Sequence, residues 1–352
     1  MENKGLLFIP DISGFTKFIN QTDIGHSRKI IQELLEILIN SNQMELEVSE
    51  IEGDAILFYK FCDSPSLKEI YEQVEKMFCA FHKHLLAYDS CRYCQCNACT
   101  SMVGLSLKVI THYGEFTSYN VKNFNKLIGK DVIIAHQLLK NEIEQHEYWL
   151  VTSSLLQDNH PAGFTNWMKW VRSSKQAEIG EILFHYTQLS PLKNNIIPDE
   201  PLQLEIPNKT KILSFTREYD ADIITLFNAT GDFNNKGRWL EGIKSIEETG
   251  HYLPRVGMSC CCTMKNEKEV IYSSSYAYDK DKIEFSETDE KKLTSTYYIL
   301  EKITDKKTRL TIEFYLRKNI IVQLFFYLLK KKKITETFSK SLQNLEEFTK
   351  EI

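Results

Sequence analysis

The sequence lacks an excess of basic charge, long apolar runs and repetitive tracts. Its 43 Lys and Arg residues against 48 Asp and Glu give a formal net charge of −5, which argues against general nucleic-acid binding because that needs a strongly basic surface. The most apolar run, Ile320–Leu329, is about half as long as a membrane span requires. No signal peptide is expected, because Met1–Pro10 is typical of a short buried strand.

The composition is typical of a globular protein with two cores. At 352 residues the chain is too long for one ordinary core, and 42% hydrophobic with 26% charged residues excludes a disordered or fibrous protein. Nine cysteines without an export signal favour a reducing compartment, where thiols bind metal or pack as small apolar groups. We therefore expect a cytoplasmic protein.

A proline-rich stretch divides the chain. Residues 190–207 hold four prolines and no apolar periodicity, which predicts a linker. We therefore expect one domain over residues 1–190, a linker over 191–207 and a second domain over 208–352. The first domain alternates strands and helices, and the second has several β-strands before a final helix with one apolar stripe. The stripe comprises Ile334, Phe338, Leu342, Leu345 and Phe348.

Two aspartates stand where carboxylates from distant parts of the chain can converge. Asp11 follows the predicted buried strand Gly5–Pro10, and Asp54 lies in a predicted hairpin turn. Two carboxylates brought together could hold the divalent ions that displacement at a phosphate needs. The spacing alone leaves a plainer alternative, in which each aspartate only caps or bends the backbone.

The residues around these aspartates resemble a known family. Phe8–Thr16 (FIPDISGFT) and Gly53–Ala55 (GDA) resemble the two metal motifs of the class III adenylyl and guanylyl cyclases, in the same order. Leu107–Glu115 (LKVITHYGE) and Leu127–Val132 (LIGKDV) are similar to later parts of the same domain. The resemblance covers about residues 5–190 and implies a ferredoxin-like βαββαβ core that works as a homodimer with composite sites.

The resemblance also implies roles for single residues. Asp11 and Asp54 would hold Mg²⁺ or Mn²⁺, with the backbone carbonyl of Ile12 as a further ligand. Glu50 and Lys126 occupy the two positions that read the purine. An acidic residue at position 50 is the type that recognises guanine, because a carboxylate can accept hydrogen bonds from the ring N–H and the exocyclic amine of guanine.

Three positions depart from the family. Its catalytic helix carries an Asn and, four residues later, an Arg that steadies the phosphoryl group, whereas this chain has Ile133 and Gln137. Lys126 replaces a small polar residue. Because phosphoryl transfer depends on electrostatic stabilisation, loss of the Arg should be severe, and both subunits of a homodimer would lack it. We therefore expect a degenerate domain that binds metal or nucleotide, with an active nucleotidyl cyclase or other metal-dependent phosphotransfer enzyme as the alternative.

Four cysteines lie close together, at Cys91, Cys94, Cys96 and Cys99. They follow a helix expected over about Ser66–Tyr88. Thiolates at C-x-x-C spacing are ligands of structural zinc sites, so the cluster predicts one zinc ion per chain. The tight loop leaves open a site shared between subunits, an iron–sulfur cluster or thiols without metal. Cys260–Cys262 favours apolar packing, because neighbouring residues of a strand face opposite ways.

The second half has an order of elements that is also familiar. A short helix is expected over Asp220–Asn228 and a loop over Gly231–Arg238 around Trp239, before several strands. The stretch that carries the resemblance is Phe227–Ile243, with Asp232 and Trp239–Gly242. With Gly257 and the closing helix, this order resembles the START and polyketide-cyclase-like (SRPBCC) superfamily over about residues 210–352. The resemblance implies a helix-grip fold, in which an antiparallel sheet and a long C-terminal helix enclose an apolar ligand cavity. Side chains that simply fill the core are the alternative.

The sequence therefore predicts an α+β protein with a ferredoxin-like, cyclase-type domain followed by a helix-grip domain. We expect a dimeric sensor or regulatory protein that binds an apolar small molecule, does not bind nucleic acid and has no membrane span. A structural or partner-binding scaffold, with both pockets filled, is the further alternative.

Overall fold

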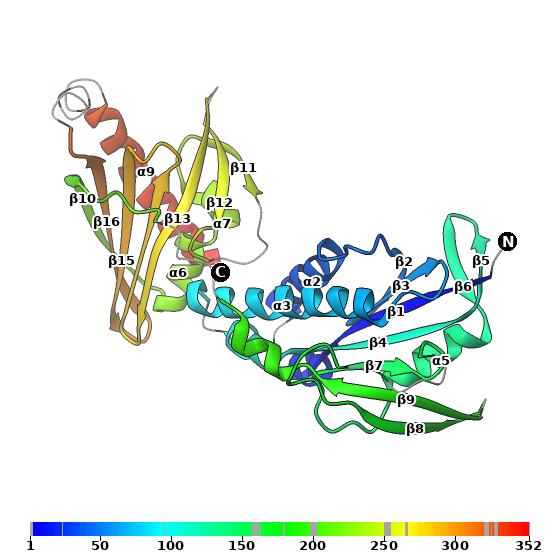
Figure 1. Cartoon of the computed structure of the whole chain (residues 1–352). Helices are drawn as coiled ribbons and strands as arrows, with labels where there is room; N and C mark the ends of the chain where they lie inside the picture. Colours follow the sequence, from blue (N-terminus) through cyan, green and yellow to red (C-terminus); the bar gives the residue numbers. More distant parts are fainter. Residues whose placement is uncertain are drawn as a thin grey trace. The chain divides into compact units, whose positions relative to one another are not determined.

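The chain folds into two compact units (Figure 1). The computed structural model describes residues 3–22, 24–94, 96–156, 161, 163–178, 180–197, 203–249, 255–264, 267–319, 324, 326 and 330–351. One unit comprises Met1–Ser90 and Cys96–Asp199, and the other comprises Cys91–Gln95 and Glu200–Ile352. The second unit is therefore built from two separate stretches of sequence.

The first unit is built on a seven-stranded sheet with the order β2-β3-β1-β4-β7-β9-β8. Its strands are β1 (Lys4–Ser13), β2 (Glu47–Glu52), β3 (Ala55–Phe61), β4 (Ser106–Glu115), β7 (Tyr148–Thr152), β8 (Val171–Ala177) and β9 (Gly180–Gln188). β4 and β7 run parallel, and the other described neighbours in this sheet are antiparallel. A separate hairpin joins β5 (Thr117–Val121) to β6 (Phe124–Ile128).

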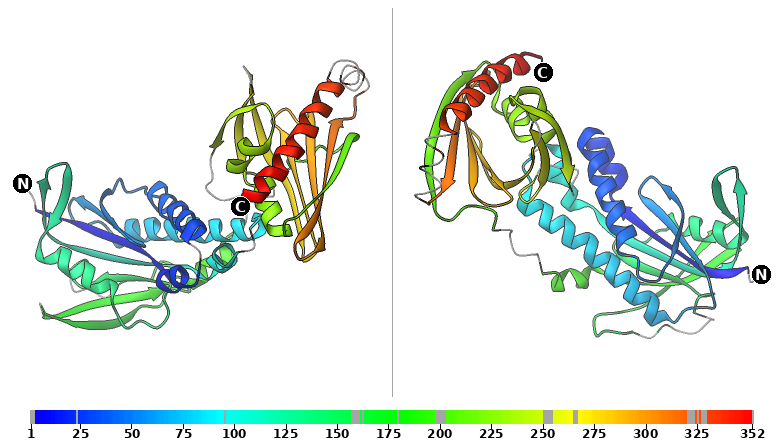
Figure 2. Two further views of the ribbon diagram at one scale, coloured as in Figure 1. Left: turned by 180° about the vertical axis from the view of Figure 1, so that it is seen from behind. Right: turned by 90° about the horizontal axis from the view of Figure 1, so that it is seen from above.

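Helices cover both faces of this sheet (Figure 2). They are α1 (Phe15–Gln21), α2 (Ile24–Asn40), α3 (Leu67–Cys91), α4 (Asn97–Ser101) and α5 (Lys130–Leu139). Alternation along β7 separates the faces. Leu150 packs in the apolar cluster of α5, whereas the Trp149 ring centroid lies 6.1 Å from that of Tyr71 in α3. From β1 to β4 the chain runs strand, helices, strand, strand, helix, strand.

The helix α3 is longer than its sequence pattern predicts. Its buried residues are Ile70, Tyr71, Gln73, Val74, Met77, Phe78, Phe81, His82, Leu85 and Tyr88. Their spacing of three and four residues gives one continuous buried face. The helix continues beyond Tyr88 and ends at Cys91, so the first of the clustered cysteines belongs to the helix.

The second unit has one antiparallel sheet with the order β10-β16-β15-β14-β13-β12-β11. Its strands are β10 (Lys209–Tyr219), β11 (Ile243–Thr249), β12 (Ser259–Met264), β13 (Glu267–Asp279), β14 (Lys282–Asp289), β15 (Thr294–Thr304) and β16 (Lys307–Arg317). Its helices are α6 (Ile223–Gly231), α7 (Phe233–Trp239) and α9 (Lys331–Glu351). Leu342, Leu345 and Phe348 of α9 pack in one apolar cluster with strand residues such as Phe285 and Ile312.

These observations confirm a mixed α+β protein with large sheets and a C-terminal helix. At the start of the predicted linker, Ser190–Asn195 forms the 3-10 helix η2 with Leu192 buried. Within the described residues, the helices are too short or too polar to cross a membrane. Most of the apolar run Ile320–Leu329 lies outside the described residues.

Candidate functional site

The predicted metal carboxylates come from neighbouring strands. Asp11 of β1 is paired in register with Ala55, the first residue of β3. The backbone N–H of Ile12 donates to the carbonyl oxygen of Asp54 at 3.0 Å. Burial, and then the charge of Asp11, raise the pKa of Asp54 to about 6. The structure thus brings the two aspartates to one end of β1, and a shared divalent ion stays a prediction.

Lys108, a single lysine in an otherwise apolar stretch of β4, stands beside Asp11. The two residues are register partners, and Lys108 Nζ lies 3.4 Å from Asp11 Oδ1 with side chains only 14% and 12% exposed. The ammonium also donates to the carbonyl oxygen of Leu139 at 3.1 Å. Burial raises the pKa of Asp11 although the charge of Lys108 opposes this. A cation of the protein therefore already balances the Asp11 carboxylate.

The two predicted purine-reading residues contact each other. Lys126 Nζ forms an ion pair with Glu50 Oε2, and His136 Nε2 of α5 lies 3.4 Å from Glu50 Oε1. The hydrogen bond and the charge of Glu50 raise the pKa of Lys126. Both carboxylate oxygens that would accept from a guanine thus have partners within the protein.

Ile133 and Gln137 of α5, which differ from the residues of the cyclase family, do not replace the missing arginine. The Ile133 side chain is exposed. The Gln137 Oε1 atom is buried and has no hydrogen-bond partner among the described residues. Its backbone carbonyl instead accepts from Lys175 Nζ of β8 at 2.7 Å. The described part of α5 therefore presents neither the amide nor the cation of the family at these positions.

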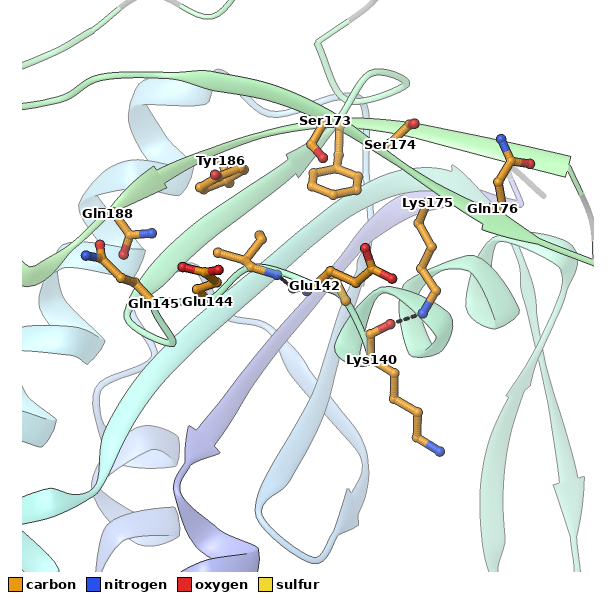
Figure 3. A pocket seen from close by; sticks show the side chains of 13 residues that line it. Lys140, Glu142, Glu144, Gln145, Ser173, Ser174, Lys175, Gln176, Tyr186 and Gln188 are labelled. Atoms are coloured by element: carbon orange, nitrogen blue, oxygen red, sulfur yellow. Dashed lines mark hydrogen bonds between the residues drawn. The ribbon is translucent and has the colours of Figure 1, made fainter.

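A cavity of about 810 Å³ lies at the C-terminal end of α5. It is lined by Lys140, Asn141, Glu142, Ile143, Glu144, Gln145, Ser173, Ser174, Lys175, Gln176, Phe184, Tyr186 and Gln188. Figure 3 shows Lys175 reaching from β8 to the carbonyl oxygen of Lys140. Burial and then Lys140 lower the pKa of Lys175. Asp11, Asp54 and Glu50 are not among the lining residues, so this cavity is distinct from the predicted nucleotide residues.

A second group of side chains has the composition of a metal site. One ligand atom from each of His26, Cys94, Cys96 and Cys99 lies within 4.8 Å of all the others. His26 Nδ1 is 3.3 Å from Cys96 Sγ and 3.4 Å from Cys99 Sγ. Bond lengths of about 2.0 Å to nitrogen and 2.3 Å to sulfur place such atoms about 3.6 Å apart around a tetrahedral zinc ion. The described residues therefore contain a group that could bind a metal.

The membership of this group differs from the predicted four cysteines. Cys91 is not a member of the group; it is the last residue of α3, and its backbone carbonyl accepts from the Val256 N–H at 2.9 Å. His26, in the first turn of α2, takes the fourth place. Tyr88 donates to Cys99 Sγ at 3.1 Å, a contact of the kind that orients metal ligands.

Aromatic side chains pack in the interior of the second unit, where the sequence predicts an apolar cavity. Tyr93 is 1% exposed, and its ring stacks on Tyr276 with centroids 4.6 Å apart. Phe227 and Phe285 belong to the same cluster as Tyr93 and as α9. A cavity of about 270 Å³ in this unit has a mainly polar lining that includes Asp220 and Asp222. An apolar ligand pocket between sheet and helix stays a prediction.

The interior of the second unit also holds a buried ion pair. Lys236 of α7 pairs with Glu287 of β14, with side chains 2% and 6% exposed. The Lys236 ammonium lies 5.1 Å from the ring centroids of Phe233 and Tyr298. Tyr298 donates to the second Glu287 oxygen at 3.4 Å. Taking two charges out of water is costly unless both are paired and hydrogen-bonded, and this pair meets that condition.

Comparisons with sequences match parts of the chain. Residues 31–148 match a family described as a protein of unknown function (DUF2652). The chain is 30% identical over 125 residues to the uncharacterized protein Rv2561/Rv2562 of Mycobacterium tuberculosis, covering 36% of this chain and 58% of that protein. The chain thus spans a little more than half of the curated relative that it matches.

Solved structures similar to the chain include nucleotidyl cyclase domains. One is the catalytic core of a rhodopsin-guanylyl cyclase with converted specificity in complex with ATPalphaS, at TM-score 0.39 and 13% identity over 53% of this chain and 96% of that chain. Another is a non-canonical dimeric guanylyl cyclase domain of the RhoGC fusion protein from the aquatic fungus Blastocladiella emersonii, at TM-score 0.34 and 13% identity over 52% of this chain and 94% of that chain. With such low scores the likeness carries no argument about activity.

Proposed function

We propose that the protein is a cytoplasmic sensor or regulatory protein with two domains. The first is a cyclase-like domain that has no catalytic activity, and the second is a helix-grip domain. The strand order β2-β3-β1-β4 and the alternation of its elements are those of a ferredoxin-like core and support the first assignment. An antiparallel sheet packed on α9 supports the second. The observation that best supports the absence of catalytic activity is the position of the Lys108 ammonium beside Asp11.

A divalent ion at Asp11 would meet that ammonium. Two unit charges 4 Å apart interact by about 4 kcal/mol at an effective dielectric constant of 20, so a divalent ion at that distance would be repelled by about 8 kcal/mol. The ion therefore binds only if Lys108 moves away or loses its proton. Even with an ion present, Ile133 and Gln137 provide no cation for the transferred phosphoryl group.

Substitution of Lys108 tests this proposal. Lys108→Met keeps the length of the side chain and removes its charge. We expect the variant to bind Mn²⁺ at least about tenfold more tightly than the wild type, because the repulsion is gone. Lys4→Met, at the exposed other end of the same sheet region, is the matched control and should leave Mn²⁺ affinity unchanged. Calorimetric titration with Mn²⁺ measures all three proteins.

Turnover is tested with the same proteins. We expect no cyclic nucleotide from ATP or GTP with Mg²⁺ or Mn²⁺, in the wild type or in Lys108→Met, when the products are separated by chromatography. Cyclic nucleotide made by the wild type and abolished by Asp54→Ala would instead establish an active cyclase. A nucleotide can still bind without turnover, but a guanine must first displace Lys126 or His136 from Glu50.

We also propose that the first unit forms a homodimer. The resemblance of the sequence motifs to the class III cyclases implies one. Sedimentation velocity over a range of protein concentrations tests this proposal, with a dimer at micromolar concentration as the expected result. A monomer at every concentration would remove the composite sites from the proposal.

The third part of the proposal is one structural zinc ion per chain at His26, Cys94, Cys96 and Cys99. The nitrogen–sulfur distances of 3.3 and 3.4 Å are close to a tetrahedral edge. Ligand atoms that all lie within 4.8 Å of one another suit one ion better than a cluster of several irons. Zinc would join the start of α2 to α4, and its binding energy would contribute to folding.

Two functions compete for the second unit. The helix-grip assignment favours an apolar small molecule as ligand, whereas the packing of Tyr93, Phe227 and Phe285 in its interior favours a scaffold. A titration with a fluorescent fatty acid separates them. One saturable site per chain supports the ligand-binding function, and the absence of saturable binding leaves the scaffold.

A further inference from the structure

A serine, a histidine and an aspartate meet at one end of the parallel strands β4 and β7. His112 Nε2 lies 2.8 Å from Asp131 Oδ1. On the other side of the ring, Ser154 Oγ lies 3.1 Å from His112 Nδ1. Thr152 Oγ1 lies between them, 2.8 Å from Nδ1 and 3.0 Å from Ser154 Oγ. Ser154, His112 and Asp131 are thus arranged as a nucleophile, a general base and a carboxylate that orients the base.

Asp131 is held rigidly in this arrangement. Its second oxygen, Oδ2, accepts from the backbone N–H of Glu115 at 2.7 Å. Gly114 makes room for it, because a Cβ atom at this glycine would lie 2.2 Å from Asp131 Cγ. Burial, the largest influence, raises the pKa of Asp131, but hydrogen bonds from His112 and Glu115 hold it below its usual value. Asp131 is therefore an ionised carboxylate with a fixed orientation.

The carboxylate determines where the imidazole carries its proton. Because Asp131 only accepts, Nε2 of His112 donates to it and Nδ1 keeps a free electron pair. That electron pair can accept a proton from Ser154 directly or through the hydroxyl of Thr152. The His112 side chain is only 3% exposed, so water does not compete strongly for this nitrogen.

Ser154 stands at an accessible position. It lies in the turn that follows β7 and is exposed, whereas His112 and Thr152 beneath it are buried. The β4 and β7 strands run parallel, with Thr111 paired to Val151, so His112 of β4 lies beside the end of β7 and the turn that follows it. Sites at the carboxyl ends of parallel strands commonly carry reactive residues.

We propose that Ser154, His112 and Asp131 form a nucleophilic site that accepts small activated esters. Ser154 Oγ forms a bond to the acyl carbon while its proton passes to His112 Nδ1. The bond from the acyl carbon to the leaving oxygen then breaks, and the leaving group takes the proton from His112. Water attacks the acyl-Ser154 ester by the same route and regenerates the serine. Asp131 acts as a positioning residue through His112.

The turn limits how good a catalyst this site is. The N–H groups of Leu155 and Leu156 both donate to the carbonyl oxygen of Thr152, at 3.1 and 3.3 Å. These two donors are therefore not directed at an oxyanion beside Ser154, and a missing oxyanion donor costs roughly a hundredfold to a thousandfold in rate. The substrate class is restricted to esters with good leaving groups, and covalent capture of the serine is the clearest measurement.

The test uses the full chain and a fluorophosphonate probe. Ser154 Oγ replaces fluoride on phosphorus, so one P–O bond forms, one P–F bond breaks and hydrogen fluoride leaves. We expect one adduct per chain, located on Ser154 by peptide mass spectrometry, and none in Ser154→Ala. Ser153→Ala is the matched control, because this neighbouring serine has no contact with His112 among the hydrogen bonds described, and it should label like the wild type.

Asp131→Asn tests whether Ser154 reacts because His112 activates it or only because it is exposed. The amide would present an N–H to Nε2 and favour the tautomer protonated at Nδ1, which cannot accept from Ser154. We expect labelling at least about tenfold slower in a protein whose circular dichroism is unchanged. Equal labelling of wild type and Ser154→Ala, or no labelling of the wild type, would overturn the proposal. Because Ser154 is exposed, its variant should fold whether or not Asp131→Asn does.

Discussion

The identity of the fourth metal ligand can be decided with two substitutions, His26→Ala and Cys91→Ser. A structural zinc site contributes about 10–16 kcal/mol of binding free energy, so one of four ligands accounts for roughly 3–4 kcal/mol. Each 1.4 kcal/mol is a factor of ten, and His26→Ala should therefore weaken zinc binding by roughly a hundredfold to a thousandfold. Cys91→Ser should leave the affinity within about threefold of the wild type, because Cys91 is outside the group.

Competition between the protein and a chromophoric zinc chelator measures these affinities. The distances argue for a large effect, since His26 Nδ1 already lies 3.3 and 3.4 Å from two of the sulfur atoms and little rearrangement is needed. The opposite outcome, with affinity kept in His26→Ala and lost in Cys91→Ser, would refute this ligand set and restore the four cysteines. Cys96→Ser should lose zinc under either assignment and serves as the positive control.

Two further predictions concern stability. Lys236→Met leaves the Glu287 charge buried without its cation and should cost about 3–5 kcal/mol in urea unfolding, whereas Lys236→Met combined with Glu287→Gln should recover most of this loss. Asp54 has its pKa raised from 3.8 to about 6 in the folded protein, so its contribution to stability is lost as the pH rises through about 6. Asp54→Asn should remove this loss and stabilise the protein at pH 8. The full pKa shift corresponds to about 3 kcal/mol, and because Asp54 is partly exposed to solvent, which screens its charge, we expect about 1 kcal/mol. The exposed Asp63→Asn is the matched control and should leave the free energy of unfolding unchanged.

Local patterns in the sequence predict most of the elements that hold the first site. The apolar run before Asp11 forms β1, and the turn with Gly53 at φ 61° joins β2 to β3. Alternation along β12 likewise places Cys260 and Cys262 inside the second unit with Cys261 less buried. These features depend on residues close together in sequence, so periodicity and turn chemistry are sufficient.

The parts that sequence patterns miss depend on contacts between distant elements. His26 is a lone histidine whose approach to Cys96 depends on how the start of α2 meets α4, a contact across 70 residues. Cys91 lies outside the group of possible ligands, and α3 continues through it, whereas a helix end is the least certain boundary in a sequence pattern. Lys108 has a local signal, a lysine between apolar strand residues, but only the register of β1 and β4 shows that it faces Asp11.

The second unit is built from two separate stretches of the chain, and this affects both its folding during translation and its expression as a fragment. Cys91–Gln95 belongs to it, and Tyr93 packs among its apolar residues. During translation Tyr93 must wait without the apolar residues that it packs against until Glu200–Ile352 has left the ribosome. A gene fragment that begins at residue 200 would encode the unit without Tyr93. Emptying a buried aromatic site costs about 3–5 kcal/mol, a large share of the roughly 5–15 kcal/mol that stabilises a domain.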